Sequence, residues 1–128
     1  ADNLLRAAME SSVYGLRAGL DPFRQQGCDF TSVRLTGGGA RSAVWRQVVA
    51  NVFNLPVSVQ QVDEGAALGA ALQAMWMHQP SPLVDLVDEH LPLDTDHTRQ
   101  PEQAEVDLYN QHYEQYRRHV GAVSALYR

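Results

Sequence analysis

The stretch Thr31-Ser32-Val33-Arg34-Leu35-Thr36-Gly37-Gly38-Gly39-Ala40-Arg41-Ser42 joins two different patterns. Apolar and polar residues alternate before the glycines, as in a strand, whereas apolar residues recur at helical spacing after Ser42. A strand that turns through glycines into a helix presents backbone amides at the positive end of the helix dipole, where no side chain blocks a phosphate. The turn therefore suits a nucleotide, and a plain tight turn between two elements is the alternative.

The residues that follow the glycines predict a strand-helix-strand-helix unit. Its first helix begins at Ser42, whose hydroxyl can cap an amide, and ends at Asn54-Leu55-Pro56. A second strand covers Pro56–Val59. A helix rich in glycine and alanine covers residues 65 to about 79, after the acidic pair Asp63-Glu64. About 20 residues separate the two strands, which suits a right-handed parallel crossover.

Other segments flank this unit on both sides. A helical pattern begins near Leu4, and Asp21-Pro22 and Gly27 mark the loop that ends this first helix. Residues 80–101 contain four prolines and several acids, which predicts an irregular, solvated connection. The helical pattern at the start has no capping residues before it, so we expect Ala1 to be an arbitrary cut, or a processing point, within a longer polypeptide.

The last helix, residues 102–126, carries one continuous apolar seam. Valines and tyrosines recur there at alternating steps of three and four, which places them on one face. Docking of this face onto its own domain is favoured over a homodimer contact, because phenol hydroxyls suit a partly wet intramolecular edge. The seam consists of Val106, Tyr109, Tyr113, Tyr116, Val120, Val123 and Tyr127.

The composition excludes several classes of function. The net charge of −5 and the scattered basic residues argue against a nucleic-acid partner. All ten basic residues are arginine, so no lysine is present to build a Walker A phosphate loop. The single cysteine, Cys28, excludes an internal disulfide and a cysteine-based zinc cluster, and it fits a reducing, cytoplasmic setting. The most apolar window, 66–77, is shorter than the about 20 residues of a membrane span.

The dinucleotide-binding fingerprint is only half matched. The string Gly37-x-Gly39-x-x-Ser42 supplies the first two glycines of the fingerprint, and Asp63 beyond the second strand is a possible ribose ligand. Ser42 stands where the third small residue belongs, and a helix precedes the first strand. A dinucleotide site is therefore a weak interpretation.

Three other features have stronger structural than functional interpretations. Trp45 falls on the apolar stripe of its helix, which favours packing over contact with a base. Arg41 lies near the loop and could meet a phosphate, but a solvated surface role is favoured. Asp94-x-Asp96-His97 does not have the spacing of a known metal-ligand set, which favours a solvated loop.

The full string Leu35-Thr36-Gly37-Gly38-Gly39-Ala40-Arg41-Ser42-x-x-Trp45-Arg46-Gln47 resembles the adenosine-binding motif of the FGGY carbohydrate kinases, most closely the xylulokinases. Three further stretches resemble that family in the same order and cover most of the chain. They are Asn3-Leu4-x-x-Ala7-Ala8-Met9-Glu10, the small-residue run Asp63–Ala71 and the tyrosine-rich last helix.

The resemblance implies an α/β fold: the C-terminal lobe of an actin-like, ribonuclease-H-like ATPase. Residues 1–128 would form part of this lobe, with the N-terminal lobe absent from the chain. Gly37, Gly38 and Gly39, with Ala40 and Ser42, would line the adenosine end of ATP. Mg²⁺, the sugar and the catalytic aspartate would be held mainly by the missing lobe. No catalytic or metal-binding residue is then expected in this chain, and the isolated fragment is expected to be inactive.

The resemblance implies transfer of the γ-phosphoryl group of Mg-ATP to D-xylulose. Related FGGY kinases acting on glycerol, gluconate or ribulose are the alternative substrate assignments. A different class of function is a non-catalytic module, which would bind an anion at the glycines and a partner protein on the tyrosine seam. The helical signature at the chain's start argues against that module having evolved independently.

Overall fold

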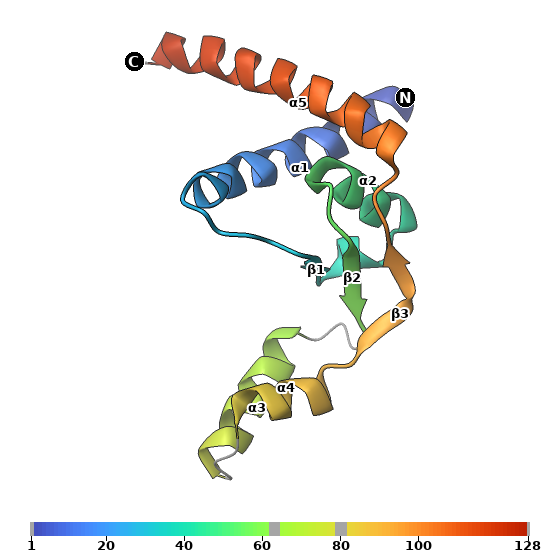
Figure 1. Cartoon of the computed structure of the whole chain (residues 1–128), viewed down its shortest axis with the longest axis vertical. Coiled ribbons are helices and arrows are strands. Elements are labelled where there is room, and N and C mark those ends of the chain that lie inside the picture. Colours follow the sequence, from blue (N-terminus) through green and yellow to red (C-terminus); the bar gives the residue numbers. More distant parts are fainter. Residues whose placement is uncertain (1, 62–64, 79–81, 128) are drawn as a thin grey trace.

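The computed structural model describes residues 2–61, 65–78 and 82–127. A three-stranded sheet with the strand order β1-β2-β3 lies at the centre of the molecule (Figure 1). Strands β1 (Val33–Leu35) and β2 (Val57–Gln60) are parallel, as the sequence predicts, and Val33 lies opposite Val57. Strand β3 (Leu93–Arg99) runs antiparallel to β2 on its other side.

The helices lie in two groups on either side of this sheet. One group, α1, α2 and α5, packs together on one side, whereas α3 and α4 pack on each other and project from the opposite side (Figure 1). Short 3₁₀ turns precede α2 and follow α5. The bounds are α1 Asp2–Gln25, η1 Gly38–Arg41, α2 Ala43–Phe53, α3 Gly65–His78, α4 Leu83–His90, α5 Gln103–Ser124 and η2 Ala125–Tyr127.

Helix α2 is the centre of the hydrophobic core. Its apolar stripe faces α1, α5 and the sheet, because valine and phenylalanine recur at helical spacing between Val48 and Phe53. Burial of these side chains from several elements supplies the main force that holds the helical group on the sheet. The buried cluster contains Val13, Tyr14, Val48, Val49, Ala50, Val52, Phe53, Val57, Tyr109 and Tyr113.

The bounds of α2 confirm the prediction from its sequence. Ser42 caps the helix, since its hydroxyl accepts a hydrogen bond from Trp45 N at 3.2 Å. At the other end Asn54 takes a left-handed conformation with φ of 52°, and Pro56 follows. The helix is thereby held between the glycine turn and the start of β2.

The prediction that Asp21-Pro22 mark the end of the first helix is wrong. Helix α1 continues through Pro22 to Gln25, and the reversal comes at Gly27, which has φ of 85°. The last turn is fixed from outside, because the Arg24 guanidinium donates to the carbonyl oxygen of Phe53 at 3.1 Å. Tertiary contact therefore overrides the helix-breaking tendency of the proline.

The prediction of an irregular connection over residues 80–101 is also wrong. This segment contains α4 and β3, and Pro82, Pro92 and Pro101 lie just outside these elements, where they remove no needed hydrogen bond. Leu86 of α4 and Leu72 of α3 are both buried. The polar strand β3 exists because β2 offers it an unpaired edge, a cause that its own sequence does not contain.

The last helix docks onto its own domain through only half of its seam. Val106, Tyr109 and Tyr113 are buried against α1 and α2, which confirms intramolecular docking there. Val120 and Val123 are 44% and 53% exposed. No helix in the described residues is both long and apolar enough to cross a lipid bilayer.

Candidate functional site: the glycine turn

The glycine turn follows directly from the carboxyl end of β1. Gly37 has φ of 83° and ψ of −176°, a backbone conformation that only glycine adopts readily. Its carbonyl oxygen then accepts the amide of Ala40 at 2.9 Å, which closes the first bond of η1. The amides of Gly38 and Gly39 precede this first bond in the sequence, so they make no hydrogen bond within the 3₁₀ turn and remain available as donors.

The surroundings of Gly38 and Gly39 differ. A Cβ atom at Gly38 would have nothing within 4 Å, whereas one at Gly39 would lie 3.3 Å from Trp45 Nε1. Trp45 is half-buried and also packs against the core, which confirms its predicted packing role. Side-chain absence at Gly38 therefore leaves open space outside the turn, while at Gly39 it accommodates the indole ring.

The turn is also bordered by the start of α3. A Cβ atom at Gly65 would lie 3.1 Å from the hydroxyl oxygen of Thr36, the residue between β1 and the glycines. This short distance explains why position 65 is glycine. It agrees with the close approach of another backbone that the glycine-rich sequence of α3 indicates. No comparable neighbour lies within 4 Å of Gly69. Asp63 and Glu64, which precede α3, lie outside the described residues.

The five residues expected to hold the nucleotide lie together in one turn, which is exposed except at Ala40. Gly37, Gly38, Gly39 and Ser42 are exposed, whereas Ala40 is buried, with 4% of its surface exposed. The Ala40 side chain therefore anchors the turn, and only its backbone is available at the surface. Arg41 is exposed on the same turn.

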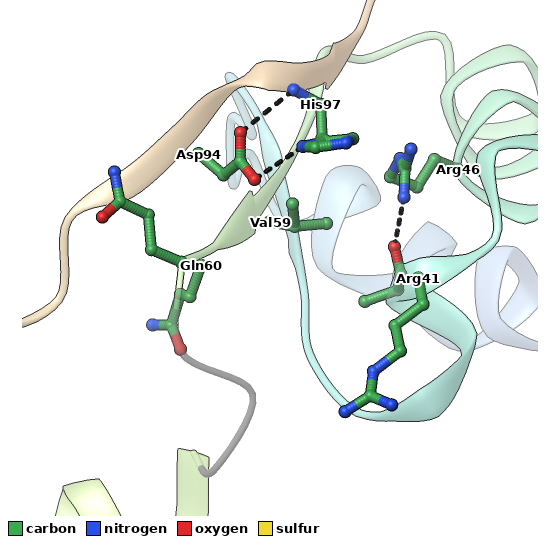
Figure 2. Close-up of a pocket in the computed structure, with 8 residues that line it drawn as sticks. Arg41, Arg46, Val59, Gln60, Asp94 and His97 are labelled. Carbon is green, nitrogen blue, oxygen red and sulfur yellow. Dashed lines mark hydrogen bonds and ion pairs between the residues drawn. The ribbon is translucent and has the colours of Figure 1, made fainter.

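A pocket of about 230 Å³ lies beside the turn, between η1, α2, β2 and β3. Figure 2 shows its ionisable side chains, with Arg41 and Arg46 on the side of η1 and α2 and Asp94 and His97 on β3. Sequence reasoning missed Arg46, although a charged residue on the apolar stripe of a helix is a usable signal. The pocket is lined by Ala40, Arg41, Arg46, Val59, Gln60, Gln61, Asp94 and His97.

Asp94 and His97 form a pair on β3, so the predicted loop is wrong, whereas His97 is exposed to solvent as expected. Asp94 Oδ2 and His97 Nδ1 are 2.6 Å apart, and Asp94 Oδ1 also accepts the backbone amides of Asp96 and His97. The hydrogen bond from His97, together with those amides, lowers the pKa of the Asp94 carboxyl group. Within the described ranges, no group of three or more His, Cys, Asp or Glu side chains could hold a metal ion.

Residues 1–78 match the C-terminal domain of the FGGY family of carbohydrate kinases, a match that covers the first helix, the glycine turn and α3. The chain belongs to this family. The match ends before α4, so β3 and α5 lie outside the part that identifies the family.

Individual relatives extend the similarity over almost the whole chain. The xylulose kinase of Haemophilus influenzae is 44% identical over 119 residues, which are 93% of this chain and 24% of that protein. The gluconate kinase of Lactobacillus acidophilus superposes with a TM-score of 0.85 at 21% identity, over 95% of this chain and 24% of that one. The xylulose kinase of Rhodospirillum rubrum superposes with a TM-score of 0.81 at 23% identity, over 96% and 25%.

These similarities establish the fold of the FGGY sugar kinases, which is an actin-like ATPase fold, and they confirm the expected α/β class. The chain spans about a quarter of the length of the relatives it matches.

Proposed function

We propose that this chain is the adenosine-binding part of an ATP-dependent sugar kinase that phosphorylates D-xylulose. The observation that carries the proposal is the glycine turn at the carboxyl end of β1, because in sheets of parallel strands ligands bind in the crevice outside these ends. The 44% identity to a xylulose kinase supports the choice of sugar.

The turn has room for a nucleotide. A side chain is absent at Gly38, where even a Cβ atom would meet nothing within 4 Å, so a ligand can approach the backbone closely there. The exposed amides of Gly38 and Gly39 would donate to the nucleotide, and Ser42 would border it. In this role the chain positions ATP, and positioning is a large part of catalysis in phosphoryl transfer.

The chemistry of the transfer belongs, in this proposal, to residues outside 1–128. Bound Mg²⁺ would neutralise charge on the transferred phosphoryl group, and a carboxylate would accept the proton of the sugar hydroxyl. We assign both functions, and the contacts to the sugar, to the rest of the kinase. Substitutions at the glycine turn should then change the affinity for ATP and leave the affinity for the sugar almost unchanged.

The test is the substitution Gly38→Val in the complete kinase, with Gly121→Val as the matched control. Neither position has a neighbour within 4 Å, and neither has a positive φ, so both variants should fold. We expect Gly38→Val to raise the KM for ATP at least tenfold, with the KM for D-xylulose and the melting temperature unchanged. Equal increases in both KM values would contradict the proposed nucleotide site. The choice of sugar would be contradicted if the unsubstituted kinase had a greater kcat/KM on gluconate, glycerol or ribulose than on D-xylulose.

A further inference from the structure

Arg46 of α2 is a buried cation with no paired anion among the residues that the structure describes. Only 3% of its surface is exposed. Its Nη1 atom donates to the carbonyl oxygen of Ala40 at 2.5 Å, whereas its Nε atom is buried without a hydrogen-bond partner. No carboxylate of the described residues lies within ion-pair distance of this guanidinium.

This arrangement leaves most of the bonding capacity of the guanidinium unused. An arginine carries five N–H donors, and a neutral carbonyl oxygen supplies no compensating charge. A buried charge without a paired anion is strongly destabilising, so such groups are normally paired or neutralised. The side chain therefore has both the charge and the free donors to bind an anion.

The pocket beside Arg46 gives such an anion access to it. Arg46 lines this pocket together with Arg41 and His97, and Gln60 and Gln61 add polar groups (Figure 2). Its volume of about 230 Å³ lies below the roughly 300–1,000 Å³ of pockets that enclose drug-sized ligands. A small ion or organic acid fits this space.

Asp94 supplies the only carboxylate among the described residues that line the pocket, and it does not neutralise Arg46. Its Oδ1 atom accepts the amides of Asp96 and His97 at 3.1 Å and 3.2 Å, and its Oδ2 atom lies 2.6 Å from His97 Nδ1. Both oxygens are thus occupied by β3 itself. The same bond fixes the His97 imidazole and leaves its Nε2 atom as the remaining polar atom of the ring.

We propose that this pocket binds a small oxyanion, a phosphate or a carboxylate group, through the guanidinium of Arg46. Planar guanidinium groups bind both kinds of oxyanion through paired N–H donors. The site is distinct from the proposed nucleotide site, because Gly37, Gly38, Gly39 and Ser42 do not line it. The two sites share only Ala40, whose carbonyl oxygen binds Arg46.

Equilibrium dialysis of the full-length protein against inorganic phosphate, and separately against acetate, tests this site. We expect saturable binding of at least one of them, with one site per chain. Arg46→Met keeps the aliphatic stem and should weaken binding at least tenfold. The matched control is Arg34→Met, which removes an exposed arginine of β1 outside the pocket and should leave binding unchanged. Whichever ion binds identifies the kind of oxyanion, and absence of saturable binding for both would overturn the proposal.

A second variant keeps the proposal testable if Arg46→Met fails to fold. Gln61→Glu introduces a negative charge at an exposed position of the pocket without altering Arg46, and it should also weaken binding. Unchanged affinity in Gln61→Glu would place the ion elsewhere. Saturation with a non-hydrolysable ATP analogue should leave oxyanion binding intact, and displacement by the analogue would overturn the assignment of a separate site. Gly38→Val should impair binding of the analogue alone, which separates failure of this proposal from failure of the kinase assignment.

Discussion

Gly37 is constrained by its own backbone and not by its neighbours. A Cβ atom there would meet nothing within 4 Å, yet φ of 83° with ψ of −176° is accessible almost only to glycine. We expect Gly37→Ala to lower the free energy of unfolding by about 1–3 kcal/mol. Gly38→Ala, at a position with equally open space and no positive φ, should leave it unchanged. Urea denaturation of both variants measures the difference, and equal losses would show that the backbone conformation is not the cause.

Tyr113 makes stability depend on pH in the alkaline range. Burial, and the hydrogen bond that its hydroxyl donates to Asp21 at 2.5 Å, raise the pKa of Tyr113 to about 12. The unfolded chain has an ordinary tyrosine pKa of about 10. The folded state thus favours the neutral phenol, and its contribution to stability is complete below pH 10 and is lost as pH rises through 12.

Unfolding measured between pH 9 and 12 tests this expectation. The free energy of unfolding should fall as pH rises, and Tyr113→Phe should make the fall shallower. Tyr127→Phe changes a tyrosine that is 84% exposed and serves as the control. Burial also raises the pKa values of Tyr14 and Tyr109, so part of the slope should survive in Tyr113→Phe. Identical slopes in both variants would rule out Tyr113 as a source of the pH dependence.

At the scale of the element, α5 is one helix with two environments. Val106 is buried, with 1% of its surface exposed, whereas Val123 on the same seam is 53% exposed. Val106→Ala removes two buried methyl groups and should lower the free energy of unfolding by about 2 kcal/mol. Val123→Ala should change stability by less than about 0.5 kcal/mol. Chemical denaturation of the two variants compares them directly, and equal losses would show that the distal half of the seam is also covered.

Local patterns predict the elements that depend mainly on their own sequence. The glycines, the Ser42 cap and the valine stripe of α2 are all readable, because each acts within a few residues along the chain. Strand β3 is not readable, since its Asp-Thr-Asp-His run becomes a strand only beside the free edge of β2. Pro22 misleads for the same reason: the contact that holds the end of α1 comes from α2.

The candidate site divides in the same way. The turn formed by Gly37, Gly38 and Gly39 is predictable from the sequence. The reason why each position needs glycine is not, because it depends on the folded surroundings, and Trp45 accounts for Gly39 alone. The charge of Arg46 on the apolar stripe of α2 is readable in the sequence. The pocket that Arg46 lines is not readable, because β2 and β3 supply its other side.

At the scale of the whole molecule, large apolar side chains remain uncovered on both helical groups. Leu4 and Leu5 of α1 are 79% and 66% exposed, and Met77 of α3 is 78% exposed. A few hundred Å² of contiguous apolar surface is enough to mark an interaction site. We therefore expect the 128-residue chain alone to self-associate.

Sedimentation velocity over a rising concentration series measures this association. The sedimentation coefficient of the 128-residue chain should increase with concentration, and the double variant Leu4→Gln, Leu5→Gln should reduce that increase. Val123→Ala, a smaller change on α5, should have less effect. A chain that stays monomeric at every concentration would show that these side chains do not drive association.

Gly65 leaves little spare room between the start of α3 and the end of β1. A Cβ atom at position 65 would lie 3.1 Å from Thr36 Oγ1, closer than an ordinary van der Waals contact. The absent side chain thus sets the spacing between these two elements, and Gly65→Ala would displace either the start of α3 or the Thr36 hydroxyl group beside the glycine turn.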